Sequence, residues 1–489
     1  MNFWYSSKIK LFSLKGAIIL LSNINSIINT ISGFLYEPYV VPLILVLAGI
    51  FFTIRMNFLQ FRLFGESVRV VSEKPVNLES TSSFGALMVS TASRVGTGNI
   101  MGVSTALCLG GAGAIFWMWV TALLGGASAF VESTLAQIYK KRYSQGHSYG
   151  GPSYYMQDAI GQRWLGIIFS IVLILTYVVG YNMLAAYNTQ DTFSVFSFYT
   201  TSTRYIVGAV LAILFAFCVL GGGRRLTKVT EVLVPVMGVM YVAVSLVVVA
   251  MNIQRVPAVF GMIFGSAFDF KAIFGGFTGS CIMYGIKRGL YSNEAGMGSA
   301  PNAAAAADVS HPAKQGLVQM LSVFIDTLLI CSATAFMCLF SGVEPTASAA
   351  GAAYVQSATR TALGDFGPLF VTVAVCLFAF TTLIGNYYYT EGCLRFILNR
   401  EPSKIFMTCF RLFATFLVFI GAAVSAGLAW DTADLLQALM VIINVPVIVI
   451  LTKPAINALK DYEAQKKAGK NPIYIAKNNG VENTDFWKN

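Results

Sequence analysis

Charged side chains are scarce in this chain of 489 residues, where Lys, Arg, Asp and Glu together make up only 11%. A soluble domain of this size carries about 25% charged residues. Hydrophobic residues reach 56%, and the mean hydropathy is +0.68. The shortage of charge excludes an ordinary water-soluble protein. Long apolar runs without alternation of apolar and polar residues argue against a β-barrel.

Other absences narrow the function. Only two histidines occur, His147 and His311, and both are interpreted as polar surface residues; no metal-binding signature appears. The eight cysteines have no paired spacing and are interpreted as small packing residues. We find no nucleophile–base pair and no phosphate-binding loop, so we expect neither an enzyme nor a cofactor. The net charge of +11 comes from basic loops and does not indicate nucleic-acid binding.

The apolar runs predict an all-α polytopic membrane protein with eleven transmembrane helices in a lipid bilayer. The expected spans are 37–56, 82–108, 112–140, 164–188, 204–220, 230–251, 269–290, 314–341, 366–391, 405–428 and 431–452. Residues 1–36 are too polar to cross and predict an amphipathic interfacial segment. Residues 37–455 form the transmembrane domain, and residues 456–489 form a polar, mobile tail.

Basic residues gather in every second loop and in the tail, which predicts the orientation. They follow the first, third, fifth, seventh and ninth spans, the pair after the seventh being Lys287 and Arg288. Because basic loops stay in the cytoplasm, we expect the N-terminus outside and the C-terminus inside. The location expected is the plasma membrane of a bacterium or archaeon.

The second span is interrupted near its centre by Gly96-Thr97-Gly98-Asn99. Glycine costs about 1 kcal/mol relative to alanine in a helix interior, so this is a poor way to build a continuous helix. Non-helical backbone at that depth is tolerated where it faces protein or a wet cavity. Transporters with inverted repeats use such a break to offer N–H groups to an anion and C=O groups to a cation. The Asn99 side-chain oxygen could also help to coordinate a cation.

An inverted repeat requires a second interrupted span at the matching place. The span 269–290 contains Thr278-Gly279-Ser280, which echoes Thr97-Gly98-Asn99. Residues 82–251 and 269–452 then form two halves of five helices each. The alternative interpretation of these small residues is close helix packing.

Longer motifs carry a family resemblance. "GTGNI" is followed by "GGAGAIFWMWVTALLGG" (110–126), "GGPSYYM" (150–156) and "GLYSNEAGMGSAP" (289–301). Together they resemble the alanine or glycine:cation symporter family, also called the sodium:alanine symporters, over residues 35–455. The resemblance implies the leucine-transporter-type five-plus-five inverted repeat behind one extra leading span.

The resemblance also implies a site. Substrate-binding residues would be Gly96, Thr97, Gly98 and Asn99 in one break and Phe277, Thr278 and Ser280 opposite them. Sodium would be bound by carbonyl groups near Ala92 and Val95 and by the hydroxyls of Thr381 and Thr382. The alternative for the two threonines is a hydroxyl bonded to the backbone of its own helix.

Four charged residues within or beside the spans are candidates for coupling or gating. Arg94, Glu132 and Asp326 lie at membrane depth, where a charge is costly and usually paired. We expect Arg94 to pair with Asp326 or Glu132, either as a structural ion pair or as a functional group. Glu294 is expected at the cytoplasmic end of its span beside Lys287 and Arg288, as a gate or a helix cap.

Two positions depart from common members of the family. Ala185 stands where many have glutamine, and Asn386 stands where many have tryptophan. Asn386 would make the pocket polar, which favours glutamine or asparagine over alanine or glycine as substrate.

We therefore predict a sodium-coupled symporter that imports a small neutral amino acid by alternating access. The alternative is an amino-acid transporter coupled to protons through Asp326 or Glu132. A hypothesis from a different functional class is a transporter-like sensor or a channel. The sequence leaves the oligomeric state open.

Overall fold

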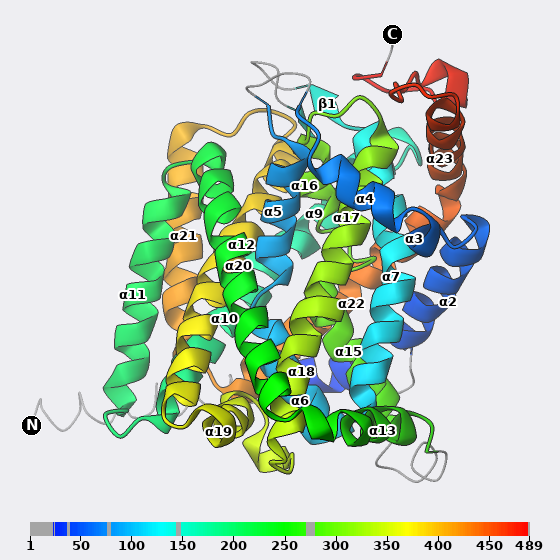
Figure 1. Ribbon diagram of the computed structural model, residues 1–489. Coiled ribbons are helices and arrows are strands. Elements are labelled where there is room, and N and C mark those ends of the chain that lie inside the picture. The colour runs from blue at the N-terminus through cyan, green and yellow to red at the C-terminus, as the bar shows by residue number, and fades with distance from the viewer. Residues whose placement is uncertain are drawn as a thin grey trace, which may run out of the picture.

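The helices form one bundle, seen in a computed structural model that describes residues 23, 25–36, 40–75, 80–142, 148–269 and 279–487 (Figure 1). One end of the bundle carries α23 (Thr452–Lys467), and the opposite end carries α13 (Val256–Ala267) and α19 (Ala352–Leu363). We call these the C-terminal end and the opposite end. In the described ranges the only strands are β1 (Lys141–Arg142) and β2 (Ser148–Tyr149), an antiparallel pair.

The remaining elements follow in chain order. The first part of the chain contains α2 (Val40–Arg55), α3 (Leu59–Arg62), α4 (Phe64–Val71), α5 (Ser83–Arg94), η1 (Thr97–Asn99), α6 (Met101–Gly110), α7 (Gly113–Ile138), α8 (Pro152–Asp158), α9 (Arg163–Ile174), η3 (Leu175–Tyr181), α10 (Asn182–Asp191), η4 (Thr192–Val195), α11 (Thr201–Val219), α12 (Gly223–Met251) and η5 (Ile253–Arg255). The second part contains α15 (Gly279–Asn293), α16 (Pro301–Ala306), α17 (Pro312–Phe324), η6 (Ile325–Cys331), α18 (Ser332–Ser341), η7 (Ala347–Ala349), α20 (Phe366–Leu398), α21 (Lys404–Gly421), α22 (Ala426–Ile450) and η8 (Lys477–Asn479).

Nine helices of the described residues are long and apolar enough to cross a membrane. The expected spans 82–108 and 269–290 are not among them: the first is divided into α5, η1 and α6, and of the second only α15 and residue 269 are described. The chain is thus an all-α polytopic protein, and the number eleven stays a prediction. Side chains such as Ile213, Phe217, Val239 and Phe416 are more than half exposed on the outer helices α11, α12 and α21, as expected for surfaces that contact lipid.

The N-terminal segment is described only in part. Residues 25–36 are helical, whereas residues 1–22 lie outside the described part. Tyr36 at the end of this helix is buried, and its hydroxyl accepts a hydrogen bond of 2.6 Å from Gln437 in α22. The interfacial location expected for residues 1–36 stays a prediction.

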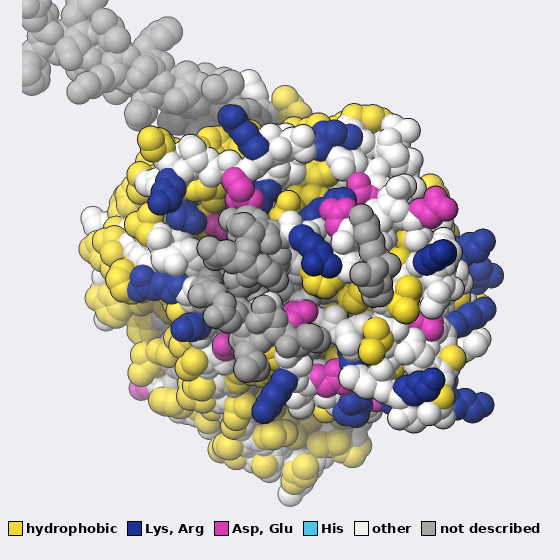
Figure 2. Space-filling model, turned by 90° about the horizontal axis from the view of Figure 1, so that it is seen from above, with side chains coloured by type: hydrophobic (Ala, Val, Ile, Leu, Met, Phe, Trp, Pro, Cys, Tyr) yellow, Lys and Arg dark blue, Asp and Glu magenta, His cyan; other side chains and the backbone are white. Residues whose placement is uncertain are grey.

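The C-terminal tail is packed against the bundle, so the expectation of a mobile extension is wrong for residues 456–487, the described part of the expected tail. Trp487 is only 6% exposed, and its indole Nε1 donates to the Gln137 carbonyl of α7 at 2.7 Å. The Tyr474 amide donates to the Ser310 carbonyl at 3.0 Å. Figure 2 shows this end of the molecule, with Lys and Arg side chains spread over it and hydrophobic side chains toward its rim.

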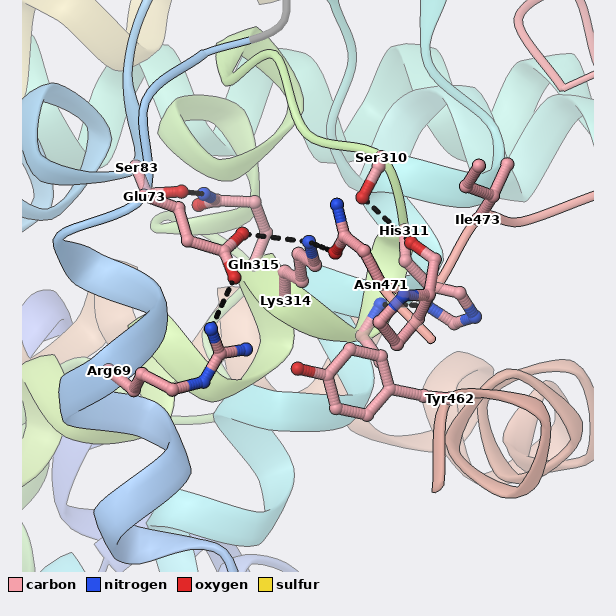
Figure 3. Close-up of polar contacts among 12 residues, drawn as sticks. Arg69, Glu73, Ser83, Ser310, His311, Lys314, Gln315, Tyr462, Asn471 and Ile473 are labelled. Carbon is pink, nitrogen blue, oxygen red and sulfur yellow. Dashed lines mark hydrogen bonds and ion pairs between the residues drawn. The ribbon is translucent and has the colours of Figure 1, made fainter. Parts of the chain in front are cut away.

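Polar contacts join the tail to the start of α17 (Figure 3). Lys314 donates to Glu73 at 2.7 Å and to Asn471 at 2.9 Å, while Arg69 pairs with Glu73 at 2.9 Å. Glu66 accepts hydrogen bonds from Arg69, Lys466 and Tyr462, and these outweigh its burial and lower its pKa to about 2. The tail therefore connects α4 and α17 through buried or half-buried charges.

His311 is buried at the start of α17, so its interpretation as a surface residue is wrong. Its Nδ1 accepts a hydrogen bond from the Ala313 amide, and its Nε2 lies 3.3 Å from Asp461. The rings of Tyr462 and Tyr474 pack edge-on against it, each at 5.1 Å between centroids. Burial lowers the pKa of His311 to about 4, and Asp461 opposes that effect only in part.

We expect Trp487→Ala to destabilise the protein by about 3 kcal/mol, because it empties a buried site and leaves the Gln137 carbonyl without its donor. The measurement is the melting temperature of the detergent-solubilised protein. Trp164→Ala is the matched control, since Trp164 is 59% exposed. Equal losses in the two variants would contradict the packing described for the tail.

Stability should also fall as the pH drops from about 6.5 to about 4. The unfolded chain protonates His311 near pH 6.5, whereas the folded chain resists protonation until about pH 4, so acid favours the unfolded state across that window. His311→Asn should show a shallower loss of melting temperature over the same window. Superimposable pH profiles would exclude His311 as the cause.

Candidate functional site

The first helix break lies between α5 and α6 and is held open by Asn99. The side-chain Oδ1 of Asn99 accepts a hydrogen bond from the Gly96 backbone N–H at 2.7 Å, and the backbone N–H of Asn99 donates to the Gly96 carbonyl at 3.2 Å. The two bonds turn the chain through η1. Asn99 Oδ1 is therefore used to cap the break, which argues against its expected role as a cation ligand.

Unpaired backbone groups flank this turn. Within the described part of the chain, the amides of Thr97 and Gly98 have no hydrogen-bond partner. On the other side, the Ala92 and Val95 carbonyls at the end of α5 also receive no hydrogen bond from a described residue. All four residues are buried. The break thus presents N–H groups and C=O groups to the protein interior, as the sequence predicts.

Thr382 of α20 lies directly against the break. A Cβ at Gly96 would collide with its Oγ1, so only glycine permits this approach. The Thr382 hydroxyl is buried and has no hydrogen-bond partner among the described residues. Thr381 differs, because its hydroxyl lies 3.0 Å from the Phe378 carbonyl and 3.1 Å from the Leu377 carbonyl of its own helix. Of the two predicted hydroxyls, Thr382 is the one available to a cation.

A second break follows α15, whereas the predicted one at Thr278-Gly279-Ser280 falls partly outside the described residues. α15 runs without interruption from Gly279 to Asn293, while Phe277 and Thr278 lie outside the described residues, and Ser280 lies within the first turn of that helix. The chain leaves the helix at Glu294–Ala300 and resumes in α16. Gly296 and Gly298 have φ of +84° and +83°, and Glu294 has φ of +54°. These left-handed conformations end the helix, a signal already present in "EAGMGSAP".

Aromatic rings and the side chain of Asn188 cover the first break. A Cβ at Gly98 would lie 2.8 Å from the ring of Tyr291 in α15, and that ring packs against Tyr181 and Trp430 at 4.9 and 5.2 Å between centroids. Asn188 of α10 donates to the Thr97 hydroxyl at 3.0 Å. Sequence reasoning missed Asn188 and Tyr291, although an asparagine within an apolar span was a usable signal.

The described contacts of Asn386 do not supply a free amide for a substrate, and the expected amide selectivity through Asn386 and Ala185 stays a prediction. Asn386 Nδ2 donates to Asn182 at 2.9 Å, and its Oδ1 lies 2.7 Å from the Ser93 hydroxyl. Its amide is therefore satisfied by the protein. Ala185 packs in an apolar cluster with α11, α20 and α21.

Arg94 is buried, 1% exposed, but it is not ion-paired with Asp326 or Glu132 in the described structure. Its Nη1 lies 3.2 Å from the Gln319 carbonyl and 3.4 Å from Gln319 Oε1, while Nε and Nη2 have no described partner. The expected direct pair is therefore wrong. Asp326, on the π-helical segment η6, instead accepts from Asn99 Nδ2 at 2.7 Å.

Lys287 and Arg288 are not in a basic loop at the C-terminal end, because both lie within α15. They pair with Asp434 of α22 at 2.8 and 2.7 Å, and Arg288 stacks over Trp430 at 4.3 Å. Glu294 directly follows the last residue of α15, so its expected location at a helix end is confirmed, but none of its described hydrogen bonds involves Lys287 or Arg288. It lies in the second break, where it accepts from Ser299 at 2.8 Å and lies 2.9 Å from the Ser93 hydroxyl.

A cavity of about 720 Å³ opens at the C-terminal end of the bundle, and no residue of either break is among its lining residues. It is bordered by the segment before α5 and by α12, α16 and α20, and its lining includes Thr81, Thr227, Lys228, Glu231, Asn302 and Tyr388. On the opposite side of the breaks, Arg288 forms an ion pair with Asp434, and the ring of Tyr291 packs against that of Trp430. Two broken helices, with a cavity on one side and packed side chains on the other, define a secondary transporter of the broken-helix class.

Comparison with known proteins agrees with that class. The solved structure of MhsT in complex with L-phenylalanine matches with a TM-score of 0.52 at 12% identity, covering 78% of this chain and 90% of that chain, which shows a shared fold. Residues 21–476 match the sodium:alanine symporter family. The chain belongs to that family, and the predicted resemblance is confirmed.

Relatives in the family carry several substrate names. The amino-acid carrier protein AlsT of Bacillus subtilis is 44% identical, over 95% of this chain and 98% of its own. The probable sodium/glutamine symporter GlnT of the same organism is 43% identical, over 89% and 91%. The sodium/alanine symporter AgcS of Methanococcus maripaludis is 37% identical, over 91% and 99%.

Proposed function

We propose that this protein is a sodium-coupled symporter that moves a small neutral amino acid across a membrane by alternating access. One observation carries the proposal: unpaired amides of Thr97 and Gly98 adjoin unpaired carbonyls of Ala92 and Val95 and the unpartnered hydroxyl of Thr382. Freed amides favour a carboxylate. Carbonyl and hydroxyl oxygens are hard ligands, which suit a hard cation such as sodium.

The cation site that we propose consists of Ala92 O, Val95 O and Thr382 Oγ1, with Thr381 as a weaker candidate. Bound sodium would then connect α5 of the first half to α20 of the second. Gly385 of α20 supports this, because a Cβ there would lie 2.6 Å from the Ser93 amide. The two helices approach closely enough for one small ion to bridge them.

We propose that the C-terminal end faces the cytoplasm of a bacterial or archaeal cell. Arg62, Arg69, Lys141 and Lys466 belong to elements at that end, and basic residues are retained on the cytoplasmic side. The cavity would then open inward, with the pair of Arg288 and Asp434 as the outer closure.

For the substrate, the described contacts favour a short side chain. The Tyr291 ring lies against Gly98, and Asn386 has no unpaired amide atom for a substrate amide. We propose alanine or glycine in preference to glutamine or asparagine, the reverse of what the sequence alone favoured.

The coupling ion is tested by amino-acid uptake into proteoliposomes under an imposed sodium gradient and, separately, under an imposed proton gradient. Thr382→Ala should raise the sodium concentration for half-maximal uptake roughly ten-fold, because it removes an oxygen ligand. Thr381→Ala is the matched control and should raise it less. Uptake driven by protons without sodium would overturn sodium coupling, and unchanged sodium dependence in Thr382→Ala would remove that residue from the site.

The substrate is tested by competition. Unlabelled alanine, glycine, glutamine and asparagine are added, each in excess, to sodium-driven uptake of labelled alanine. We expect alanine and glycine to compete at concentrations at least ten-fold lower than the two amides, since a longer side chain must displace Tyr291. Stronger competition by glutamine or asparagine would refute the size argument and leave sodium coupling intact.

A further inference from the structure

Each helix break is held by an acid from the second long helix of the other half. Asp326, in the α17–η6–α18 helix of the second half, binds Asn99 of the first break. Glu132, in α7 of the first half, binds the second break. The two acids are fully buried. Both are hydrogen-bonded to a break, so neither is an incidental buried charge.

The contacts of Glu132 are directed at the main chain of the second break. Its Oε2 accepts from the Gly298 amide at 3.0 Å, and its Oε1 accepts from the Gly296 amide at 3.4 Å. Both glycines have positive φ, which turns their N–H groups toward one side. A carboxylate with two acceptor oxygens matches that pair of donors.

Asn444 of α22 completes the arrangement. Its Nδ2 donates to Glu132 Oε2 at 3.0 Å and to the Gly296 carbonyl at 2.9 Å. Tyr155 of α8 donates in turn to Asn444 Oδ1. The second break is thus attached to three other helices through a single carboxylate and a single amide.

The second break determines where the end of α15 lies. Tyr291, which covers Gly98, is three residues before Glu294, and Ser292 donates to Asp326 at 2.8 Å. A displacement of Gly296 and Gly298 would therefore move the ring that covers the first break. None of Glu132's hydrogen bonds reaches Ala92, Val95 or Thr382, the proposed cation ligands.

Buried Arg94 supplies the compensating charge. It interacts electrostatically with Glu132, Glu294 and Asp326, and two of its nitrogens have no described hydrogen-bond partner. The described hydrogen bonds of Arg94 go to Gln319, so Arg94 does not occupy the acceptor positions of these acids. Glu132 and Asp326 remain free to bind the two breaks.

We propose that Glu132 is a positioning residue for the amino acid: it holds the second break so that Tyr291 closes over the first, and it takes no part in cation binding. The inference rests on the proposed function. It predicts that loss of the carboxylate raises the amino-acid concentration for half-maximal uptake and leaves the sodium concentration for half-maximal uptake nearly unchanged.

The test is Glu132→Gln in the full-length protein, reconstituted in proteoliposomes. Glutamine replaces one acceptor oxygen by an NH₂ group. This hydrogen-bond donor would then lie opposite another donor, either a glycine N–H group or the Asn444 amide. We expect the alanine concentration for half-maximal uptake to rise roughly ten-fold at saturating sodium. The sodium concentration for half-maximal uptake at saturating alanine should change less than three-fold. Glu132→Asp, which keeps the charge, should recover part of the loss.

Glu66→Gln is the matched control, because Glu66 is also a buried, hydrogen-bonded acid but contacts only α4 and α23. It should leave both half-maximal concentrations unchanged. If Glu132→Gln changes neither concentration, or changes both equally, the proposal is overturned. Should Glu132→Gln fail to fold, Asn444→Ala removes the partner amide and must weaken alanine selectively, or the proposal fails.

A second readout does not depend on transport. Amide hydrogen exchange of a peptide that covers residues 294–300 should be several-fold faster in Glu132→Gln than in the wild type or Glu66→Gln, because the Gly296 and Gly298 donors lose an acceptor. Unchanged exchange would overturn the proposal. Faster exchange in a protein that shows no sodium-driven uptake would instead retain the contact and refute the proposed function.

Discussion

Unpaired backbone groups inside a membrane domain are the constraint on which the rest of this structure depends. Each buried N–H or C=O without a partner costs free energy, and water is not present in the bilayer core to supply one. The two breaks expose such groups at Gly96–Asn99 and at Glu294–Ala300. Asn99 binds the Gly96 N–H group of the first break. In the second break, Glu132 binds the Gly298 N–H group and Asn444 binds the Gly296 carbonyl. The groups left unsatisfied, at Thr97, Gly98, Ala92 and Val95, are then the ones that a ligand can use.

Polar residues near the breaks fall into two groups with different consequences. Asn386, Asn182, Ser93 and Glu294 bond to one another and tie α20, α10, α5 and the second break together. Thr382 lacks a described partner although it lies beside the same break. Residues that bond to one another hold the helices together, although Asn182 Nδ2 in this network also lacks a described partner. The sequence alone does not distinguish these residues from Thr382.

Charge is distributed unevenly about the breaks. At the C-terminal end, acids and bases pair near the surface, as in Arg62 with Glu463 and Lys141 with Asp158. On the other side, Lys287 and Arg288 share Asp434 within the helices. Exposed pairs contribute little to stability, whereas a shared buried acid resists separation of the helices that carry its partners. The pairs with Asp434 therefore hold α15 and α22 together.

By itself the sequence determined the membrane class, the all-helical fold and the first break. These follow from local properties: the length of apolar runs, and glycines flanked by polar residues in a short segment. It also contained the motif of the second break, but "TGS" and "GMGSA" are equally plausible as isolated strings. Only the φ values of Gly296 and Gly298 decide between them.

Tertiary structure alone decided which polar side chain meets which. Glu132 and Gly298 are 166 residues apart in the chain, Asn99 and Asp326 are 227 apart, and Trp487 reaches Gln137 across 350. Basic residues counted as a loop, Lys287 and Arg288, proved to be helical partners of Asp434. No local pattern encodes such pairs, because their energy depends on the desolvation and close approach of helices that meet only when the whole bundle has packed.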